Sequence, residues 1–242
     1  MIIHQMEQRS PAWFQVRLGI PTSSDFDKIV TPKGKLSEQS AGYMNRLLAE
    51  WIMGAPIEDI ATQYMDRGTE LEERAFRSYE FDCGTTTKEV GFITSDDGMI
   101  GCSPDRLVCE FNGAVELKCP SAPVHVGHMV NRTIDEKHKP QVQGQLYIGG
   151  FDWVDVQSYH PNFPSVIIRA TRDEKYIENL AAALRSFVDV MLNCRVKLEQ
   201  QYGPFQRMVV KPATDDGLNV SDEDIDFMIS KGAICPDASK TR

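Results

Sequence analysis

The chain has 242 residues, with 26 Lys and Arg against 35 Asp and Glu, so its formal net charge is −9. Hydrophobic residues make up 41% of the chain and charged residues 25%, which is typical of a soluble globular protein and excludes disorder for most of its length. No apolar run approaches the ~20 residues that a bilayer requires, and no secretory signal is visible, so we expect a cytoplasmic protein. The acidic balance disfavours general adhesion to nucleic acid. It does not exclude an enzyme that acts on nucleic acid, because binding depends on local groups of Lys and Arg.

Helix signals dominate the N-terminal third of the chain. Ser10 before Pro11 is typical of an N-cap followed by proline in the first turn, and predicts a short helix that ends near Arg17. Residues 22–25, Thr-Ser-Ser-Asp, indicate a second helix start before apolar residues at helical spacing. Two longer helices are predicted over 37–53 and 62–81.

Strand signals begin after Gly84. Short segments rich in Val, Ile, Phe and Leu are separated by Asp-Gly, Ser-Pro and Asn-Gly turns, which predicts a meander of strands at 88–94, 99–103, 106–111 and 114–119. A polar stretch over 121–139 contains three histidines, which we interpret as loop histidines because no cysteine pair accompanies them at zinc-ligand spacing. They are His125, His128 and His138. The elements predicted next are a helix around 141–148, strands at 153–159 and 165–170, and a long helix from about 173 to 201.

This order of elements predicts an α/β domain over residues 1–202. Residues 203–242 are expected to form a separate C-terminal appendage, in which two prolines precede an acidic segment at 221–226 that is typical of a short capped helix. Two interpretations of the appendage stay open: a segment that docks on another subunit or partner, and a loosely packed tail.

Two carboxylates and a lysine fall on one predicted hairpin. Glu116 and Lys118 lie two positions apart on a strand, so they point to the same face, and parity puts Asp105 on that face too. Leu117 points to the opposite, half-buried side, so the charged residues line a cleft or face solvent. Such a group suits a hard divalent cation, with the ammonium nearby to hold water or phosphate.

The register of this hairpin stays open in the sequence. A two-residue turn at Asn112-Gly113 would pair Glu116 with Cys109 and leave Asp105 ~13 Å away along the strand, too far to share one ion. A four-residue loop over 109–112 would instead bring Asp105 directly opposite Glu116. A bend at Pro104 before the strand is a further possibility.

Several spaced motifs together resemble a known family. The Asp-x10-Glu-x-Lys spacing from Asp105 matches the PD-(D/E)xK nuclease signature. More closely, the chain resembles the phage lambda exonuclease and YqaJ-type viral recombinase group over about residues 8–200, in matching order. The segments that carry the resemblance are 13–19 with 22–24, 67–72, 102–105, 116–120 and 141–143.

The resemblance implies a PD-(D/E)xK nuclease fold, in which helices flank a central mixed β-sheet. It also implies a metal-dependent hydrolase that digests one strand of duplex DNA from a 5′ end and leaves 3′ single-stranded tails for phage-type recombination. Mg²⁺ is the expected cofactor, and Mn²⁺ is expected to substitute for it.

The resemblance also assigns the residues of the metal site. Asp105 and Glu116 would bind the ion with the Leu117 carbonyl, Lys118 would orient or activate the attacking water, and Glu72 would act through the water shell of the metal. Gln141 aligns with a family glutamine beside the scissile phosphate. The other interpretation of Glu72 is a solvated glutamate on an acidic helix.

A second group of residues matches the family's pocket for the 5′-terminal phosphate. Arg17 offers bidentate contacts to phosphate, and the Ser24 hydroxyl at a helix N-terminus adds a donor. Ser103 is expected to contact the DNA backbone, and Gln143 to take part in binding DNA. The alternative is that Ser24 is only a helix cap and Arg17 only a surface charge.

The expected partners are double-stranded DNA ends, further copies of the chain in a homotrimeric ring, and a single-strand annealing protein. This fits the recombination system of a phage or prophage in a bacterial host. Two other functions remain open: an endonuclease of the same superfamily, and a non-catalytic protein that binds DNA ends. The pocket for a terminal phosphate disfavours the first, and the intact Asp105, Glu116 and Lys118 set disfavours the second.

Overall fold

A computed structural model describes residues 1–57 and 63–205, and only the backbone of residues 63–70. The helices are α1 (Pro11–Arg17), α2 (Ser40–Met53), α3 (Gln63–Cys83), α4 (Ala122–Asn131), α5 (Lys139–Gly149) and α6 (Glu174–Tyr202), with 3-10 turns η1 (Ser23–Lys28) and η2 (Glu136–His138). The strands are β1 (Ile2–His4), β2 (Thr87–Lys88), β3 (Phe92–Thr94), β4 (Gly101–Cys102), β5 (Arg106–Val108), β6 (Gly113–Lys118), β7 (Trp153–Ser158) and β8 (Val166–Thr171). Within these residues, no helix combines the length and the apolar character needed to cross a bilayer.

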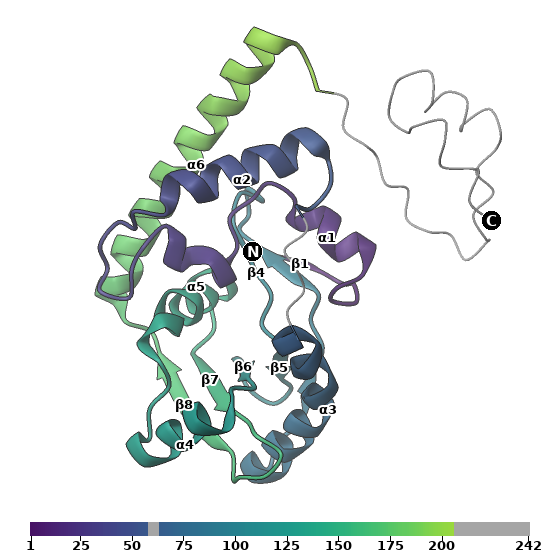
Figure 1. Ribbon diagram of the computed structural model, residues 1–242, viewed down its shortest axis with the longest axis vertical. Coiled ribbons are helices and arrows are strands. Elements are labelled where there is room, and N and C mark those ends of the chain that lie inside the picture. The colour runs from purple at the N-terminus through teal and green to yellow at the C-terminus, as the bar shows by residue number, and fades with distance from the viewer. Residues whose placement is uncertain (58–62, 206–242) are drawn as a thin grey trace, which may run out of the picture. The chain divides into compact units, whose positions relative to one another are not determined.

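The strands form two sheets (Figure 1). The larger has the order β2-β5-β6-β7-β8, with β6 and β7 parallel and the other neighbours antiparallel. The smaller has the order β1-β3-β4. The expected mixed sheet flanked by helices is therefore confirmed. The expected single meander is wrong, because β3 lies between the N-terminal strand β1 and β4 in a separate sheet, and β4 does not pair with β5.

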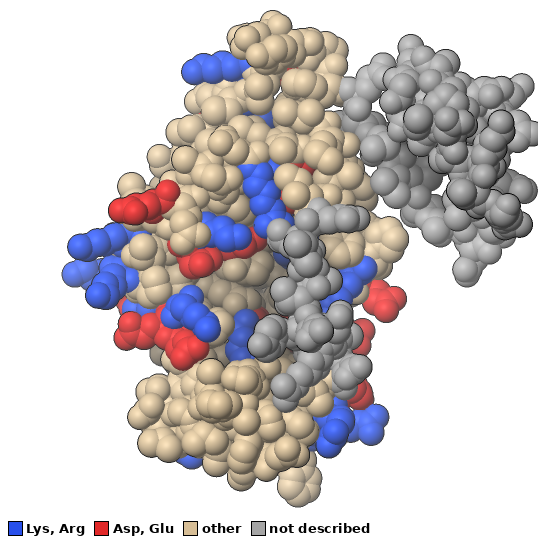
Figure 2. All heavy atoms as spheres, viewed as in Figure 1, with Lys and Arg blue, Asp and Glu red and all other residues tan. Residues whose placement is uncertain are grey.

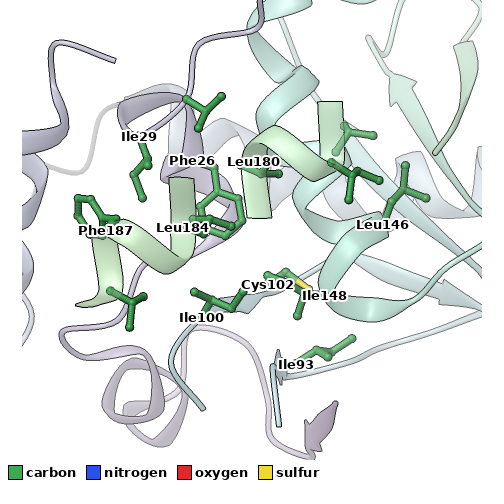
Figure 3. Close-up of a cluster of buried hydrophobic side chains, with 14 of the residues drawn as sticks. Phe26, Ile29, Ile93, Ile100, Cys102, Leu146, Ile148, Leu180, Leu184 and Phe187 are labelled. Carbon is green, nitrogen blue, oxygen red and sulfur yellow. The ribbon is translucent and has the colours of Figure 1, made fainter. Parts of the chain in front are cut away.

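Helices cover both faces of the larger sheet. On one face, Phe76 and Tyr79 of α3 pack against Val108 and Val115. On the other face, α5 and α6 share a continuous core with η1 and the smaller sheet (Figure 3). Successive residues of β6 thus alternate between two packed layers, so Glu116 and Lys118 lie on the α5 side, while Val115 and Leu117 contact the α3 side.

Two helix starts lie where the capping residues predict them, and two other segments differ from the sequence prediction. The Ser10 hydroxyl accepts the Trp13 N–H at the start of α1, and Asp173 accepts the Tyr176 N–H at the start of α6. The second predicted helix start is a six-residue 3-10 turn instead of an α-helix. The stretch 121–139 is not a loop, because α4 and η2 occupy most of it.

The interface between α5 and η1 depends on a residue without a side chain. A Cβ added at Gly144 would lie 2.5 Å from Cδ2 of the fully buried Phe26 and 3.3 Å from Cβ of Ser23. Real Cβ atoms do not approach so closely, so α5 packs against η1 only because Gly144 allows it. This contact holds Gln141 of α5 and Ser24 of η1 in one structural unit.

We expect Gly144→Ala to lower the free energy of unfolding by about 1–3 kcal/mol, because the new methyl group overpacks a rigid core. Gly127→Ala is the matched control, since Gly127 also lies within a helix and a Cβ there would meet nothing within 4 Å. That control should gain up to ~1 kcal/mol, the usual helix preference for alanine. Urea unfolding of both variants measures the difference, and equal effects at the two positions would contradict the close approach.

Candidate active site

Asp105 lies in a bend immediately before β5, and continuing the register of β5 and β6 places it beside Glu116. Arg106 pairs with Val115 and Leu107 with Ala114, and the Asp105 N–H donates to the Val115 carbonyl at 3.1 Å. The register therefore corresponds to a four-residue loop over 109–112, and the two-residue turn is wrong. The loop is wider than a two-residue turn because its two end residues bond to segments outside the hairpin. The Cys109 N–H donates to the Thr86 carbonyl, and the Asn112 carbonyl accepts the Asp152 N–H.

Glu116 is the centre of the polar contacts on this face. One carboxylate oxygen accepts hydrogen bonds from Lys118 Nζ at 2.7 Å and from Gln141 Nε2 at 2.6 Å. The other accepts from Gln145 Nε2 at 2.5 Å. Glu116 is buried, so these donors hold its carboxylate in a single orientation.

Asp105 is held against the neighbouring strand. Its Oδ2 accepts the Leu117 N–H at 2.6 Å. Desolvation, and then the charge of Glu116, raise the pKa of Asp105 well above its ordinary range. Burial lowers the pKa of Lys118. The negative charges of Glu116 and Asp105 outweigh this effect, so the lysine pKa lies above its usual value.

Two facing carboxylates with mutual repulsion fit a divalent cation. The N–H and C=O of an extended residue point to the same side of the strand, so the Leu117 carbonyl faces the side of Asp105. Asp105, Glu116 and this carbonyl offer only oxygen ligands, the donor type that Mg²⁺ prefers. Among the described residues, no group of three or more His, Cys, Asp or Glu side chains gathers into a metal site. The fit therefore rests on two carboxylates and a backbone oxygen.

Glu72 reaches the same cleft from α3. It lines a cavity of ≈ 240 Å³ together with Asp105 and Arg9, and its charge adds to the upward shift of the Asp105 pKa. Arg9 binds the Glu72 carboxylate with both terminal nitrogens, at 2.6 and 3.2 Å. Arg9 belongs to none of the sequence motifs, so no sequence signal singles it out.

Arg17, Ser24 and Ser103 meet in a second site. Arg17 donates to the Ser103 hydroxyl at 3.0 Å and to the Thr22 hydroxyl at 3.4 Å, and the Thr22 and Ser24 oxygens are 3.2 Å apart. The Ser103 oxygen also accepts the Trp13 indole N–H at 3.1 Å. The Ser103 oxygen thus accepts two hydrogen bonds, which uses both of its lone pairs. Its O–H proton can therefore donate to a bound anion.

Arg17 is half-buried. Its guanidinium lies over the Trp13 ring, 3.9 Å from the centroid, and burial lowers its pKa to about 10, so it stays charged at neutral pH. Arg17, Ser24, Thr22 and Arg9 all line a cavity of ≈ 600 Å³. Because η1 has only six residues, its terminus adds little dipole. The charges that line this cavity are the guanidinium groups of Arg9, Arg17 and Arg46 and the carboxylates of Asp25 and Glu50. On the face in Figure 2, charged side chains of both signs gather around a hollow.

Comparison with known proteins agrees with this geometry. The family model described as the YqaJ-like viral recombinase domain matches residues 12–152. This chain belongs to that family. No protein with a curated description matches it.

Solved structures give the same assignment. An alkaline exonuclease from Laribacter hongkongensis, LHK-Exo, is 27% identical with a TM-score of 0.72, and the match covers 79% of this chain and 97% of that one. Its complex with dAMP matches at 28% identity with the same TM-score and the same coverage. A phage-related exonuclease from Haemophilus somnus has 16% identity and a TM-score of 0.56 over 73% of this chain and 96% of that one, and shows a shared fold. The family and the LHK-Exo matches support a nuclease role.

Within this YqaJ-like domain, the glutamines of α5 divide between two sides. Gln141 and Gln145, four residues apart, both point to Glu116, and Gln141 Oε1 also accepts a hydrogen bond from Lys118 Nζ at 3.0 Å. Gln143 instead donates to the Thr171 carbonyl and accepts the Asp173 N–H, each at 2.9 Å, so it is buried and directed away from the cleft. Sequence reasoning missed Gln145, although its spacing from Gln141 puts both on one helix face.

Other predicted features of the YqaJ-like chain also have clear positions. His125 and His128 are not loop histidines: they lie buried on α4, and their Nδ1 atoms are 2.8 and 2.9 Å from the Ser158 hydroxyl. His138 ends η2, and burial lowers its pKa to about 4. Side chains 67–70 of the motif that leads to Glu72 lie outside the described residues, as does the acidic segment 221–226 of the predicted appendage.

Proposed function

We propose that the chain is a Mg²⁺-dependent 5′→3′ exonuclease that acts on linear double-stranded DNA. The observation that carries this proposal is the segment Ser103-Pro104-Asp105, which joins the two sites. Ser103 contacts Arg17, while Asp105, two residues on, faces Glu116. A strand end whose phosphate bound Arg17 and Ser103 would therefore extend toward the carboxylates.

In this proposal each side chain of the cleft has one task. Asp105, Glu116 and the Leu117 carbonyl would hold Mg²⁺, with Mn²⁺ as a substitute, and Glu72 would bind its water shell. The ion, when bound, polarises the scissile phosphate and lowers the pKa of its water. Lys118, held by Glu116 and Gln141, orients the attacking water and donates to the developing charge.

The products follow from the position of the end-binding pocket. Gripping the 5′-phosphate beside the cleft releases 5′-mononucleotides and leaves a 3′ single-stranded tail. The complex of the related LHK-Exo with dAMP, a mononucleotide, supports this product class. The 3′ tail would be the substrate of a single-strand annealing protein in a phage or prophage recombination system, in the cytoplasm of a bacterial host.

Assembly and domain organisation are part of the same proposal. A homotrimeric ring would enclose the duplex and keep the enzyme on it. Residues 1–202 would form the nuclease domain, and 203–242 an appendage that docks on a subunit or partner. Light scattering of the full chain and of a chain ending at residue 202 tests both ideas, and a monomeric full chain would contradict the ring.

The experiment that tests the activity uses linear duplex DNA with a 5′-phosphate or a 5′-hydroxyl, in Mg²⁺ or EDTA. We expect Mg²⁺-dependent release of mononucleotides, faster from the phosphorylated end. Cleavage of a closed circle would favour an endonuclease instead. End binding without hydrolysis would favour a binding protein.

The preference for the 5′-phosphate should depend on Arg17 and Ser24. We expect Ser24→Ala, at an exposed position, to reduce the preference severalfold, and Arg17→Lys to reduce it about tenfold or more, because lysine lacks the bidentate fork. The two DNA ends and the variants form a thermodynamic cycle that separates this contact from a general loss of activity. An unchanged preference in Arg17→Lys would remove the pocket from the mechanism.

A further inference from the structure

Arg9 is the residue that the two sites share. It lines the ≈ 240 Å³ cavity with Asp105 and Glu72, and also the ≈ 600 Å³ cavity with Arg17 and Ser24. A DNA strand that reached from one cavity to the other would pass its guanidinium.

The backbone at Arg9 is unusual. Its φ is +65°, in the left-handed region that glycine adopts freely and that costs other residues roughly 1 kcal/mol. Arg132 is the other non-glycine residue with positive φ among the described residues, at +51°. A costly backbone conformation that directs a charged side chain into a cleft often marks a functional site.

The contacts of Arg9 show what its side chain can bind. Its two terminal nitrogens grip the two oxygens of Glu72, and half of its side chain is exposed. The hydrogen bond to Glu72 raises the Arg9 pKa, so it carries its charge throughout the neutral range. The same fork fits two oxygens of a phosphodiester.

We propose that Arg9 binds the backbone phosphate next to the 5′-terminal nucleotide of the DNA, exchanging Glu72 for that phosphate. The exchange frees the Glu72 carboxylate to face the metal-binding carboxylates. This inference rests on the proposed function, because it assumes that a DNA strand joins the two cavities. It makes Glu72 and the DNA competitors for one guanidinium.

The test compares Arg9→Gly with Arg132→Gly. Both changes remove one positive charge and both relieve a left-handed backbone, but Arg132 lies at the C-terminal end of α4, outside both cavities. Fluorescence anisotropy with a 5′-phosphorylated duplex end in EDTA, at several salt concentrations, gives affinity and salt slope. Differential scanning fluorimetry gives Tm.

We expect Arg9→Gly to keep or raise Tm and to bind the duplex end about ten- to a hundredfold more weakly. Its slope of log affinity against log salt should fall by about 0.7–0.9, the loss of one phosphate contact. Arg132→Gly should keep both DNA readouts. Arg9→Lys, which retains the charge but not the fork, should keep the salt slope and lose part of the affinity.

Two results would overturn the inference. One is unchanged affinity and salt slope in Arg9→Gly, including the case in which only kcat falls, because Arg9 would then merely position Glu72. The other is an equal loss of affinity in Arg132→Gly, which would indicate a general charge effect. Failure of the proposed function is distinct, since it would show as wild-type protein that leaves duplex DNA intact in Mg²⁺.

Discussion

Replacing Lys118 with methionine should lower the rate of DNA hydrolysis by about 10²–10⁴-fold while duplex ends still bind. The Lys118 ammonium contacts Glu116 and Gln141, and its removal takes away the donor that we propose orients water and stabilises developing charge. Methionine keeps the length of the side chain and limits the cavity left behind. Single-turnover release of mononucleotides measures the chemical step, and anisotropy measures binding.

The same variant should also become more dependent on Mg²⁺ for stability. Without the ammonium, the repulsion between Asp105 and Glu116 loses the positive charge of Lys118 that offsets it. We therefore expect Tm in EDTA to fall and the gain in Tm on adding Mg²⁺ to rise. Lys137→Met is the matched control, because Lys137 is mostly exposed and pairs with Asp135. Equal activity loss in the control, or undiminished hydrolysis in Lys118→Met, would contradict the role of Lys118.

The parts of this molecule that could be predicted were those set by local rules. Strand alternation placed Glu116 and Lys118 on one face, and the capping residues Ser10 and Asp173 start their helices. The family match confirmed the resemblance to YqaJ-type recombinases, and the mixed sheet confirmed the fold class. The strand faces and the helix starts depend on residues a few positions apart.

The features that were missed depend on distant residues. The hairpin register is determined by the contacts of Cys109 with Thr86 and of Asn112 with Asp152, which are invisible to turn statistics. The sequence predicts a loop at α4 because histidine is a polar residue, but both histidines of α4 are buried and hydrogen-bond to the Ser158 hydroxyl. Arg9 could not be found from any local pattern, because its partner Glu72 lies 63 positions away.

Replacing Asp105 with asparagine should stabilise the metal-free protein and at the same time reduce hydrolysis by 10²-fold or more. Asparagine can still accept the Leu117 N–H through its carbonyl oxygen, but it carries no charge against Glu116. We expect a gain of about 0.5–2 kcal/mol in EDTA, the usual size for a single stabilising substitution. The same change removes a proposed ligand, so we expect Mg²⁺ to raise Tm in the wild type but not in Asp105→Asn.

The pH dependence of stability gives this prediction a sign that can be checked. The raised pKa means that folded wild-type protein retains a proton at the Asp105 site to higher pH than the unfolded chain, where the carboxyl titrates near ~4. In EDTA its stability should therefore be lost progressively as the pH rises above ~4, and Asp105→Asn should lack this loss.

Asp97 is the opposite control, because hydrogen bonds from Ser95 and the Met99 N–H lower its pKa, so Asp97→Asn should lose a little stability above pH ~4 and keep full activity. If Asp105→Asn were less stable than wild type in EDTA at pH 8, the two carboxylates would not repel each other, and the main argument for a cation between them would fail.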